Sequence, residues 1–403
     1  MPANQSQLRV ALFSGNYNHV RDGANQALNK LVGYLESQGV AVRVYSPTGD
    51  TPAFPPTGTL ISAPSIMIPG RTEYRFGIGI NARVRRDIEA FKPTLFHLSA
   101  PDLLGFAAKR LARRMGVPAV ASFHTRFDTY FEFYGLGWFR KHAENILRAF
   151  YHDLPETYAT SEGFAEVLRE QGISENIAVW SRGIDKQRFN PGKRSLEWRR
   201  SLGIADTDVV VGFVGRLVLE KGLDVVAATM AELERRGVPA KLLIVGEGPA
   251  RVKFEAQAPG AIFTGSLAGD DLPRAYASSD MLINPSTTET FGNVTLEAMA
   301  SGLPVVAAIA TGNNCLVTDG VSGALVPPGD IGRFADAIAA LVADPAARAA
   351  AGAAGLAAAQ NYDWDTINGG MLDHYRAVVA NFGVSPILTE SGFGPAMAIN
   401  SVV

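Results

Sequence analysis

Residues 281–297 read MLINPSTTETFGNVTLE, and this stretch decides the fold class and the candidate chemistry of the chain. It opens with the apolar run 281–285, which is typical of a parallel strand buried on both faces. The segment 294–300 has the pattern of a helix start. A strand, a short loop and a helix in this order form part of a βαβ unit, so we predict an α/β protein with parallel sheets.

Two carboxylates, Glu289 and Glu297, stand eight positions apart in this stretch. We expect Glu289 in the loop after the strand and Glu297 about one turn into the helix, with the N–H groups of Phe291, Gly292 and Asn293 between them. Unpaired N–H groups and the dipole at a helix N-terminus favour an anion. A carboxylate on each side of a phosphate cradle suits a nucleotide sugar, which carries phosphate in its middle and hydroxyls at both ends.

Short apolar runs alternate with amphipathic stretches along the chain, and this series occurs twice around a polar seam at 186–201. The alternation indicates right-handed βαβ units. We therefore expect two doubly wound, Rossmann-like domains, residues 1–189 and 190–365, that face a central cleft at the carboxyl ends of their strands. The expected strands lie at 8–14, 41–46, 94–99, 118–123, 157–160, 177–180, 209–214, 241–245, 261–264, 281–284, 304–308 and 324–326.

Three segments depart from this alternation. Residues 48–75 are rich in Pro, Gly and Thr, which predicts a long surface loop. The alanine-rich stretch 335–359 predicts two helices, because Asp344-Pro345 interrupts it. The chain loses its periodicity beyond Asn381, so 383–403 is predicted to be a poorly ordered tail.

The composition bounds the class of protein. A chain of 403 residues is too long for one ordinary core, and 47% hydrophobic with 19% charged residues indicates a well-packed globular protein. The net charge of −2 argues against a nucleic-acid partner.

The lack of a visible targeting signal and the single cysteine predict a cytoplasmic protein. The N-terminus has no basic segment followed by an apolar core, and no window approaches 18 uninterrupted apolar residues. We expect a cytoplasmic location, with a peripheral position on the inner face of the cell membrane left open. Cys315 excludes an intrachain disulfide, and we expect it to be a small buried apolar residue rather than a reactive thiol.

A second candidate phosphate site follows the strand at 209–214, in the sequence GRLVLEKG at 215–222. Gly215 permits close backbone approach, Arg216 can bind two phosphate oxygens, and Lys221 adds a point charge. The alternative is an ordinary loop with surface cations. The neighbouring Glu289 segment favours the ligand site. Two further loops can add to this candidate ligand site. The turn at Gly246, after a buried strand, can line the ligand, and backbone groups near Leu267 can bind a base edge.

The first half offers the opposite wall of the cleft. Gly15 and Gly23 would let backbone approach a phosphate, but their spacing of eight is no dinucleotide fingerprint, so an oxidoreductase is disfavoured. His124 ends the strand at 118–123, where it can bond a sugar hydroxyl or a backbone carbonyl. The alternative for a lone histidine is a structural role with both nitrogens satisfied, and the position at a strand end favours function.

The aromatic segment 127–142 ends in cations, and with Arg126 it suggests an acceptor mouth containing Tyr130 and Trp138 or a patch that meets anionic lipid. The alternative is a packed aromatic helix with a cationic end. A basic surface in the same half consists of Arg71, Arg75, Arg83, Arg85 and Arg86.

We expect neither a metal nor another cofactor. The chain has no His-x-x-x-His, no cysteine pair and no Asp-x-Asp at a strand end. The charge of a leaving diphosphate would then be balanced by Arg216, Lys221 and a helix N-terminus.

Taken together, these motifs resemble the family-four retaining glycosyltransferases of the GT-B fold. The resemblance covers nearly the whole chain and is strongest over 209–330, through the two glutamates of 289–297, the GRLVLEKG run and the sequence EAMASGLPVVA at 297–307. It implies that Glu289 bonds hydroxyls of the donor sugar, that Glu297 bonds the ribose, and that Arg216 and Lys221 hold the diphosphate.

The resemblance also implies roles for the first domain. This domain would be the acceptor side, and the second would bind the nucleotide sugar. Gly23 would face the donor, His124 would touch the sugar near the reacting centre, and a helix within 366–382 would cross back onto the first domain. Transfer would proceed with retention through an oxocarbenium-like transition state, with leaving-group stabilisation as the largest catalytic effect.

The segments FHT at 123–125 and TGSLAGDDL at 264–272 are most similar to the branch that glycosylates membrane lipids, which includes sulfoquinovosyl-, glucosyl- and glucuronosyl-diacylglycerol synthases and related mannosyltransferases. The entry loop GNYNHVRDG at 15–23 departs from the Gly-Gly loop usual in the family. We predict transfer of a hexose from a UDP- or GDP-sugar to a lipid hydroxyl such as that of diacylglycerol. The alternatives are a soluble polysaccharide or polyol acceptor, a non-catalytic nucleotide-sugar-binding protein, and an epimerase.

Overall fold

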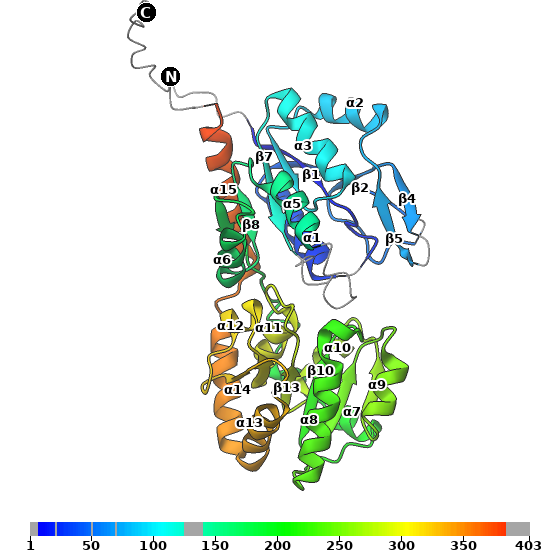
Figure 1. The fold of residues 1–403 in the computed structure, drawn as a ribbon, viewed down its shortest axis with the longest axis vertical. Helices are drawn as coiled ribbons and strands as arrows, with labels where there is room; N and C mark the ends of the chain where they lie inside the picture. The colour runs from blue at the N-terminus through cyan, green and yellow to red at the C-terminus, as the bar shows by residue number, and fades with distance from the viewer. Residues whose placement is uncertain (1–6, 21, 50, 69–70, 125–139, 384–403) are drawn as a thin grey trace, which may run out of the picture.

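The computed structural model describes residues 7–20, 22–49, 51–68, 71–124 and 140–383 (Figure 1). Two parallel sheets form two lobes that lie one above the other in Figure 1. All pairings within both sheets are parallel, and helices cover their faces. This arrangement confirms the α/β class with two Rossmann-like units.

The first sheet has seven strands in the order β3-β2-β1-β6-β7-β8-β9. Its strands are β1 Arg9–Phe13, β2 Ala41–Ser46, β3 Thr59–Ser62, β6 Leu95–Leu98, β7 Ala119–Phe123, β8 Thr157–Ala159 and β9 Ile177–Val179. Its helices are α1 Gly23–Ser37, α2 Ala82–Phe91, α3 Leu103–Met115, α5 Arg140–Tyr151 and α6 Glu162–Glu170. An antiparallel hairpin of β4 Ser65–Ile68 and β5 Arg71–Gly77 stands apart from the sheet.

The second sheet has six strands in the order β12-β11-β10-β13-β14-β15. They are β10 Val210–Val214, β11 Lys241–Val245, β12 Ile262–Gly265, β13 Met281–Asn284, β14 Val305–Ala308 and β15 Gly323–Val326. The helices are α7 Leu196–Ser201, α8 Leu223–Arg235, α9 Arg251–Gln257, α10 Asp271–Ala277, α11 Asn293–Ala300, α12 Thr311–Leu316, α13 Ile331–Ala343, α14 Pro345–Ala359 and α15 Trp364–Asn381, with short 3₁₀ turns η2 Pro191–Lys193 and η3 Leu219–Lys221.

Every strand expected from the sequence is present, but the long loop expected at 48–75 is wrong in part. This segment contains β3, which pairs with the free edge of β2, and the β4–β5 hairpin. Strand formation here depends on an available sheet edge, which local composition does not report.

The alanine-rich stretch forms two helices, as predicted. The side chain of Asp344 accepts hydrogen bonds from the N–H groups of Ala346 and Ala347, and Pro345 occupies the first turn of α14. A proline lacks the N–H that a helix interior needs, so α13 ends before it.

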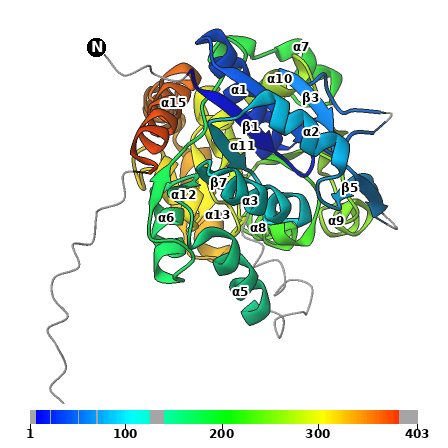
Figure 2. The ribbon, with the colours of Figure 1, turned by 90° about the horizontal axis from the view of Figure 1, so that it is seen from above.

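The last helix, α15, returns to the first lobe after the second is complete. Its buried residues Met371, Leu372 and Tyr375 share a hydrophobic cluster with Leu28 and Leu31 of α1. Figure 2 shows α15 beside the first lobe and close to α1. The chain therefore crosses between the lobes twice, at the segment after β9 and again before α15.

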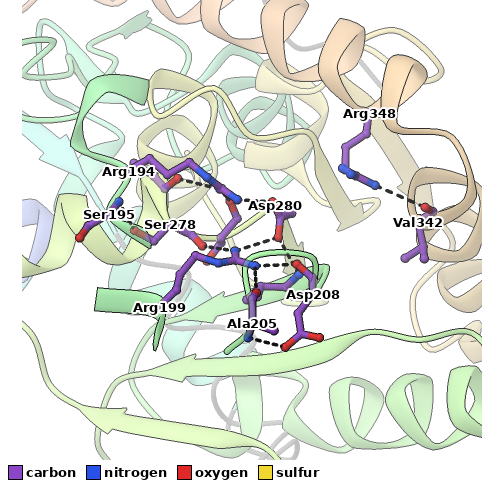
Figure 3. Close-up of polar contacts among 12 residues, drawn as sticks. Arg194, Ser195, Arg199, Ala205, Asp208, Ser278, Asp280, Val342 and Arg348 are labelled. Carbon is purple, nitrogen blue, oxygen red and sulfur yellow. Dashed lines mark hydrogen bonds and ion pairs between the residues drawn. The ribbon is translucent and has the colours of Figure 1, made fainter. Parts of the chain in front are cut away.

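A buried arginine anchors the first crossing to the second lobe (Figure 3). The guanidinium of Arg199, which is fully buried, donates to Oδ2 of Asp280 at 3.0 Å and to the carbonyl of Ser278 at 2.8 Å. Arg194 binds the other oxygen of Asp280 at 2.8 Å. These bonds pin the start of the second lobe to the segment before β13, whose carboxyl end carries Glu289.

Among the described helices, none is by itself long and apolar enough to cross a membrane; only the bent pair of 331–343 with 345–381 meets that length and composition together, at an angle of 107°.

Candidate active site

Glu289 and Lys221 form an ion pair at the carboxyl end of the second sheet. Nζ of Lys221 donates to Oε1 of Glu289 at 2.6 Å, and the two side chains are 28% and 12% exposed. The Glu289 carbonyl accepts from the N–H of Gly312 and from Oγ1 of Thr311, both at 2.8 Å. The acid expected to bind a sugar and the cation expected to bind phosphate are therefore in contact.

The N-terminus of α11 lies next to this pair. Gly292 caps it with φ of 95°, a left-handed conformation that favours glycine. Within the described residues, no carbonyl or side chain accepts from the N–H of Gly292 or Asn293. These donors remain available to an anion. The Phe291 ring, 4% exposed, packs in the core against Tyr362, so this residue would offer its backbone rather than its ring.

Glu297 lies deeper on α11, where Oη of Tyr276 donates to its Oε2 at 2.7 Å. Burial raises the pKa of Glu297 to about 7, against the opposing effects of Tyr276 and Arg188. The carboxyl lines a pocket together with Gly23, Arg188 and Asn293. It is therefore a partly buried acceptor that opens onto the space between the lobes.

Gly23 is the point where the first lobe meets α11. A Cβ added there would lie 2.0 Å from Nδ2 of Asn293. The absence of a side chain thus allows the start of α1 to approach the start of α11. The sequence placed Gly23 and Asn293 on opposite walls of one site, and the structure brings them into contact.

Gly215 and Gly246 pack backbone against backbone. A Cβ on Gly246 would lie 1.9 Å from the carbonyl oxygen of Gly215, which explains the glycine at 246 without any ligand.

Arg216 directly follows Gly215, and its side chain is exposed just beyond the end of β10. Leu267, two residues beyond β12, is partly buried against the cluster that contains Val245.

His124 directly follows β7, and both of its ring nitrogens have partners inside the protein. Nδ1 accepts from Nη2 of Arg182 at 2.7 Å, and Nε2 lies 2.8 Å from Oγ of Ser122. Burial and the charge of Arg182 hold the pKa of His124 well below its usual range. The ring thus offers no free nitrogen to a sugar hydroxyl in this structure and has the satisfied environment of the structural alternative.

Arg182 is the buried cation of this region. It is 3% exposed, stacks on the Trp180 ring at 4.8 Å and donates to the carbonyls of Trp180 and Ser181. Burial lowers its pKa to about 9, while the charge of Asp22 opposes this effect. Asp22, the residue before Gly23, caps α1 by accepting from the N–H of Asn25.

Thr290 ties the two lobes together beside Glu289. Its Oγ1 donates to the carbonyl of His124 at 3.0 Å. Its own carbonyl accepts from Oγ1 of Thr160 at 2.8 Å and from Oγ of Ser161 at 2.7 Å. The loop that carries Glu289 is therefore held from both lobes.

Two family models match most of the chain: the model described as "Glycosyltransferase Family 4" over residues 21–188, and the model described as "Glycosyl transferases group 1" over residues 208–344. A GDP-mannose-dependent alpha-mannosyltransferase of Mycobacterium tuberculosis is 33% identical, over 92% of this chain and 97% of the relative. The chain belongs to glycosyltransferase family four. It is a hexosyltransferase, and two further relatives fit this assignment.

The first of these is a GDP-mannose-dependent alpha-mannosyltransferase of Corynebacterium glutamicum, 29% identical over 97% of this chain and 94% of the relative. The second is the sulfoquinovosyl transferase SQD2 of Arabidopsis thaliana, 32% identical over 88% of this chain and 71% of the relative.

Solved structures agree on the fold. Sucrose-phosphate synthase from Thermosynechococcus elongatus superimposes with a TM-score of 0.75 at 22% identity, over 93% of this chain and 99% of that one. Anabaena HepE in complex with UDP and glucose gives a TM-score of 0.72 at 21% identity, over 92% and 100%. The glycosyltransferase therefore has the GT-B arrangement of two facing lobes.

Several site residues of the glycosyltransferase escaped the sequence analysis. Arg182 lies three residues beyond β9, and the rule that selected His124, a polar residue near a strand end, would have selected it too. Tyr276 and the pair Thr160 and Ser161 carry no local signal, because their partners are distant in the chain.

Three other sequence predictions, on the acceptor-side residues, Cys315 and metal binding, can be compared with the described residues. The acceptor-side residues Arg126, Tyr130 and Trp138 lie outside the described residues, as does the tail beyond 383. Cys315 is exposed rather than buried, because it lies on the short surface helix α12; its thiol faces the carbonyl of Thr311. Among the residues that the structure describes, no group of three or more His, Cys, Asp or Glu side chains could hold a metal ion.

Proposed function

We propose that the enzyme transfers a hexose from a UDP- or GDP-sugar to an acceptor hydroxyl with retention, without a metal, and that the acceptor is a membrane lipid such as diacylglycerol. The observation that carries the donor part is the contact of Lys221 with Glu289 beside the unpaired N–H groups of Gly292 and Asn293. A cation from the loop after β10, together with a carboxylate and a helix N-terminus from the segment after β13, matches a diphosphate that is bonded to a sugar.

Donor binding would rearrange the ion pair. The β-phosphate would attract Nζ of Lys221 and lie against the N–H groups of Gly292 and Asn293, with Arg216 as a second cation. Glu289, released from Lys221, would accept hydrogen bonds from sugar hydroxyls, and Glu297 would accept from the ribose. Support for this arrangement comes from Lys221 and Glu289, which are already in contact beside the N-terminus of α11.

These groups would stabilise the leaving diphosphate in the transition state. The bond from C1 to the phosphate oxygen breaks while the acceptor oxygen approaches C1 from the same face. The acceptor proton passes to an oxygen of the departing phosphate, so no protein base is needed. Preorganised donors at a developing charge supply about 3–4 kcal/mol each in other enzymes.

The proposed lipid acceptor rests on the relatives and on the surface of the first lobe. One relative is named alpha-monoglucosyldiacylglycerol synthase, and it is 26% identical over 79% of this chain and 75% of its own length. The hairpin and the segment after it expose Ile66, Met67, Phe76 and Ile78. The arginines of α2, Arg83, Arg85 and Arg86, follow closely in the chain. Apolar side chains with nearby cations suit an anionic membrane, so we propose a peripheral position on its cytoplasmic face.

A donor panel tests the proposal. Purified enzyme is incubated with UDP-glucose, UDP-galactose, UDP-glucuronate or GDP-mannose, each with and without diacylglycerol in mixed micelles, and products are identified by mass spectrometry and anomeric NMR. We expect one donor to yield an α-linked glycolipid. Glu289→Gln should abolish it, while Glu234→Gln, at an exposed position of α8, should not.

Two other results would contradict parts of the proposal. Nucleotide release without a glycolipid would exclude the lipid acceptor and favour a soluble one. Neither release nor product from any donor, with no thermal stabilisation by any of them, would exclude the proposed donor class.

A further inference from the structure

A chain of buried polar groups runs from α15 to the cleft. Oη of Tyr375 bonds Nδ1 of His97, and Nε2 of His97 lies 2.8 Å from Oγ of Ser122. The same hydroxyl lies 2.8 Å from Nε2 of His124, whose Nδ1 is 2.7 Å from Nη2 of Arg182. His97, Ser122 and Tyr375 are fully buried, so water does not compete for these bonds.

Arg182 sets the direction of the bonds at its end of the chain. A guanidinium only donates, so Nδ1 of His124 must accept and its proton must lie on Nε2. Nε2–H of His124 then donates to Oγ of Ser122, the Ser122 hydroxyl donates to Nε2 of His97, and Nδ1–H of His97 donates to Oη of Tyr375. One buried cation thus specifies a single neutral tautomer for both histidines.

The chain continues through the backbone of His124 into the second lobe. The carbonyl of His124 accepts from Oγ1 of Thr290. The carbonyl of Thr290 in turn accepts from the hydroxyls of Thr160 and Ser161. Glu289 is the adjacent residue. The orientation of the His124 peptide is therefore transmitted to the loop that carries the proposed sugar-binding acid.

We propose that Tyr375, His97, Ser122 and Arg182 are positioning residues, which hold His124 so that its carbonyl fixes Thr290 and, through it, Glu289. This inference rests on the proposed function only for the role of Glu289. It assigns to the returning helix α15 a task beyond packing: its seating on the first lobe is coupled by hydrogen bonds to the active-site loop.

Packing alone is the competing explanation, because Tyr375 also belongs to the apolar cluster beneath α1. The two explanations differ in what the tyrosine hydroxyl does. Tyr158 provides the matched control, since its ring lies in the same cluster, 6.2 Å from both His97 and Tyr375, but its hydroxyl donates to Glu156 at 2.8 Å.

The test compares Tyr375→Phe with Tyr158→Phe in the full chain. Each change removes one buried hydroxyl and keeps the ring. We expect Tyr375→Phe to lower kcat by about five- to twentyfold with little change in the KM of the donor, because positioning affects the transition state more than ground-state binding. Tyr158→Phe should stay within about twofold of the wild type.

A second measurement does not depend on activity. Amide hydrogen exchange of peptides covering 286–296 should become about five- to tenfold faster in Tyr375→Phe and remain unchanged in Tyr158→Phe. Thr290→Val should produce the same loosening, and Thr290→Ser, which keeps the hydroxyl, should restore the wild-type rate.

The outcomes separate the two proposals. If the wild type transfers no sugar, the proposed function fails, while the exchange measurement still decides the coupling. If both tyrosine variants lose equal stability and leave exchange of 286–296 and kcat unchanged, the network serves only the fold and the inference is wrong.

Discussion

At the scale of single residues, the site is built from charges that are compensated before a donor arrives. Lys221 neutralises Glu289, and Tyr276 donates to Glu297, so both glutamates have partners within the protein. An unpaired buried carboxylate would cost several kcal/mol. The site thus stays stable without its ligand while keeping groups that a ligand can recruit.

The first prediction concerns the Lys221–Glu289 pair. Lys221→Met and Glu289→Gln should each destabilise the enzyme by about 1–3 kcal/mol, because each leaves a partly buried charge alone. The double variant should lose less than the sum of the two, by about 1–2 kcal/mol. Urea unfolding measures the stability. Transfer should fall by at least about 100-fold in all three, so a double variant with restored activity would contradict the assigned roles.

The second prediction concerns Glu297, whose pKa rises from 4.5 to about 7 in the folded enzyme. Between these values the folded state binds more protons than the unfolded state, so this residue lowers stability as the pH rises from 4.5 to 7. Glu297→Gln should therefore stabilise the enzyme at pH 8 by about 1–3 kcal/mol and have little effect at pH 4.5.

Thermal unfolding across this pH range measures the effect, with Glu234→Gln as a control for an exposed carboxylate. Donor affinity should fall in Glu297→Gln despite the gain in stability. A uniform shift in stability at every pH would exclude the raised pKa as its cause.

At the scale of elements, a glycine inside a helix can mark where two backbones meet, but it does not always do so. Gly352 of α14 lies against the carbonyl of Gly302, and a Cβ at 352 would come within 2.2 Å of that oxygen. Gly370 of α15 has no heavy atom within 4 Å of the corresponding position. The same residue type therefore serves close packing at one site and has no contact to explain it at the other.

The third prediction follows from this contrast. Gly352→Ala should destabilise the enzyme by about 1–3 kcal/mol, since backbone atoms must move. Gly370→Ala should stabilise it by about 0.5–1 kcal/mol, because alanine loses less entropy in a helix. Chemical denaturation of both variants checks the pair. Equal effects would mean that the packing of α14 against Gly302 is not as tight as described.

At the scale of the whole molecule, the lobes already touch where the donor should lie. Gly23 meets Asn293, and Thr290 is bonded to the first lobe, so we expect the lobes to part when a nucleotide sugar enters. Two-lobed transferases of this kind are expected to open and close during turnover.

The fourth prediction uses the single cysteine. A Cβ at Gly163 of α6 would lie 3.8 Å from Sγ of Cys315 on α12, which is close enough for a disulfide between the lobes. Gly163→Cys should form this bond on oxidation, and kcat should fall by at least about tenfold and recover with reductant. Gly163→Ser and the double variant Gly163→Cys with Cys315→Ser are the controls. Full activity of the cross-linked enzyme would show that turnover needs no separation at this contact.

The sequence by itself determined every strand of the second sheet and the candidate ligand-binding loops, because their signals are local. The strand, loop and helix of 281–300 are encoded by the periodicity of that stretch alone, and Glu289, Lys221 and Glu297 follow from rules about strand ends and helix starts. The break between α13 and α14 is equally local, since it depends on Asp344 and Pro345.

Only the tertiary structure decided which distant groups meet. β3 exists because β2 has a free edge, Cys315 is exposed because α12 lies at the surface, and the ring of His124 is occupied because Arg182 returns to it from 58 residues away. His97 and Tyr375 are 278 residues apart. Hydrophobic periodicity reports which face of an element is buried, but the partner of a buried polar group depends on the path of the whole chain.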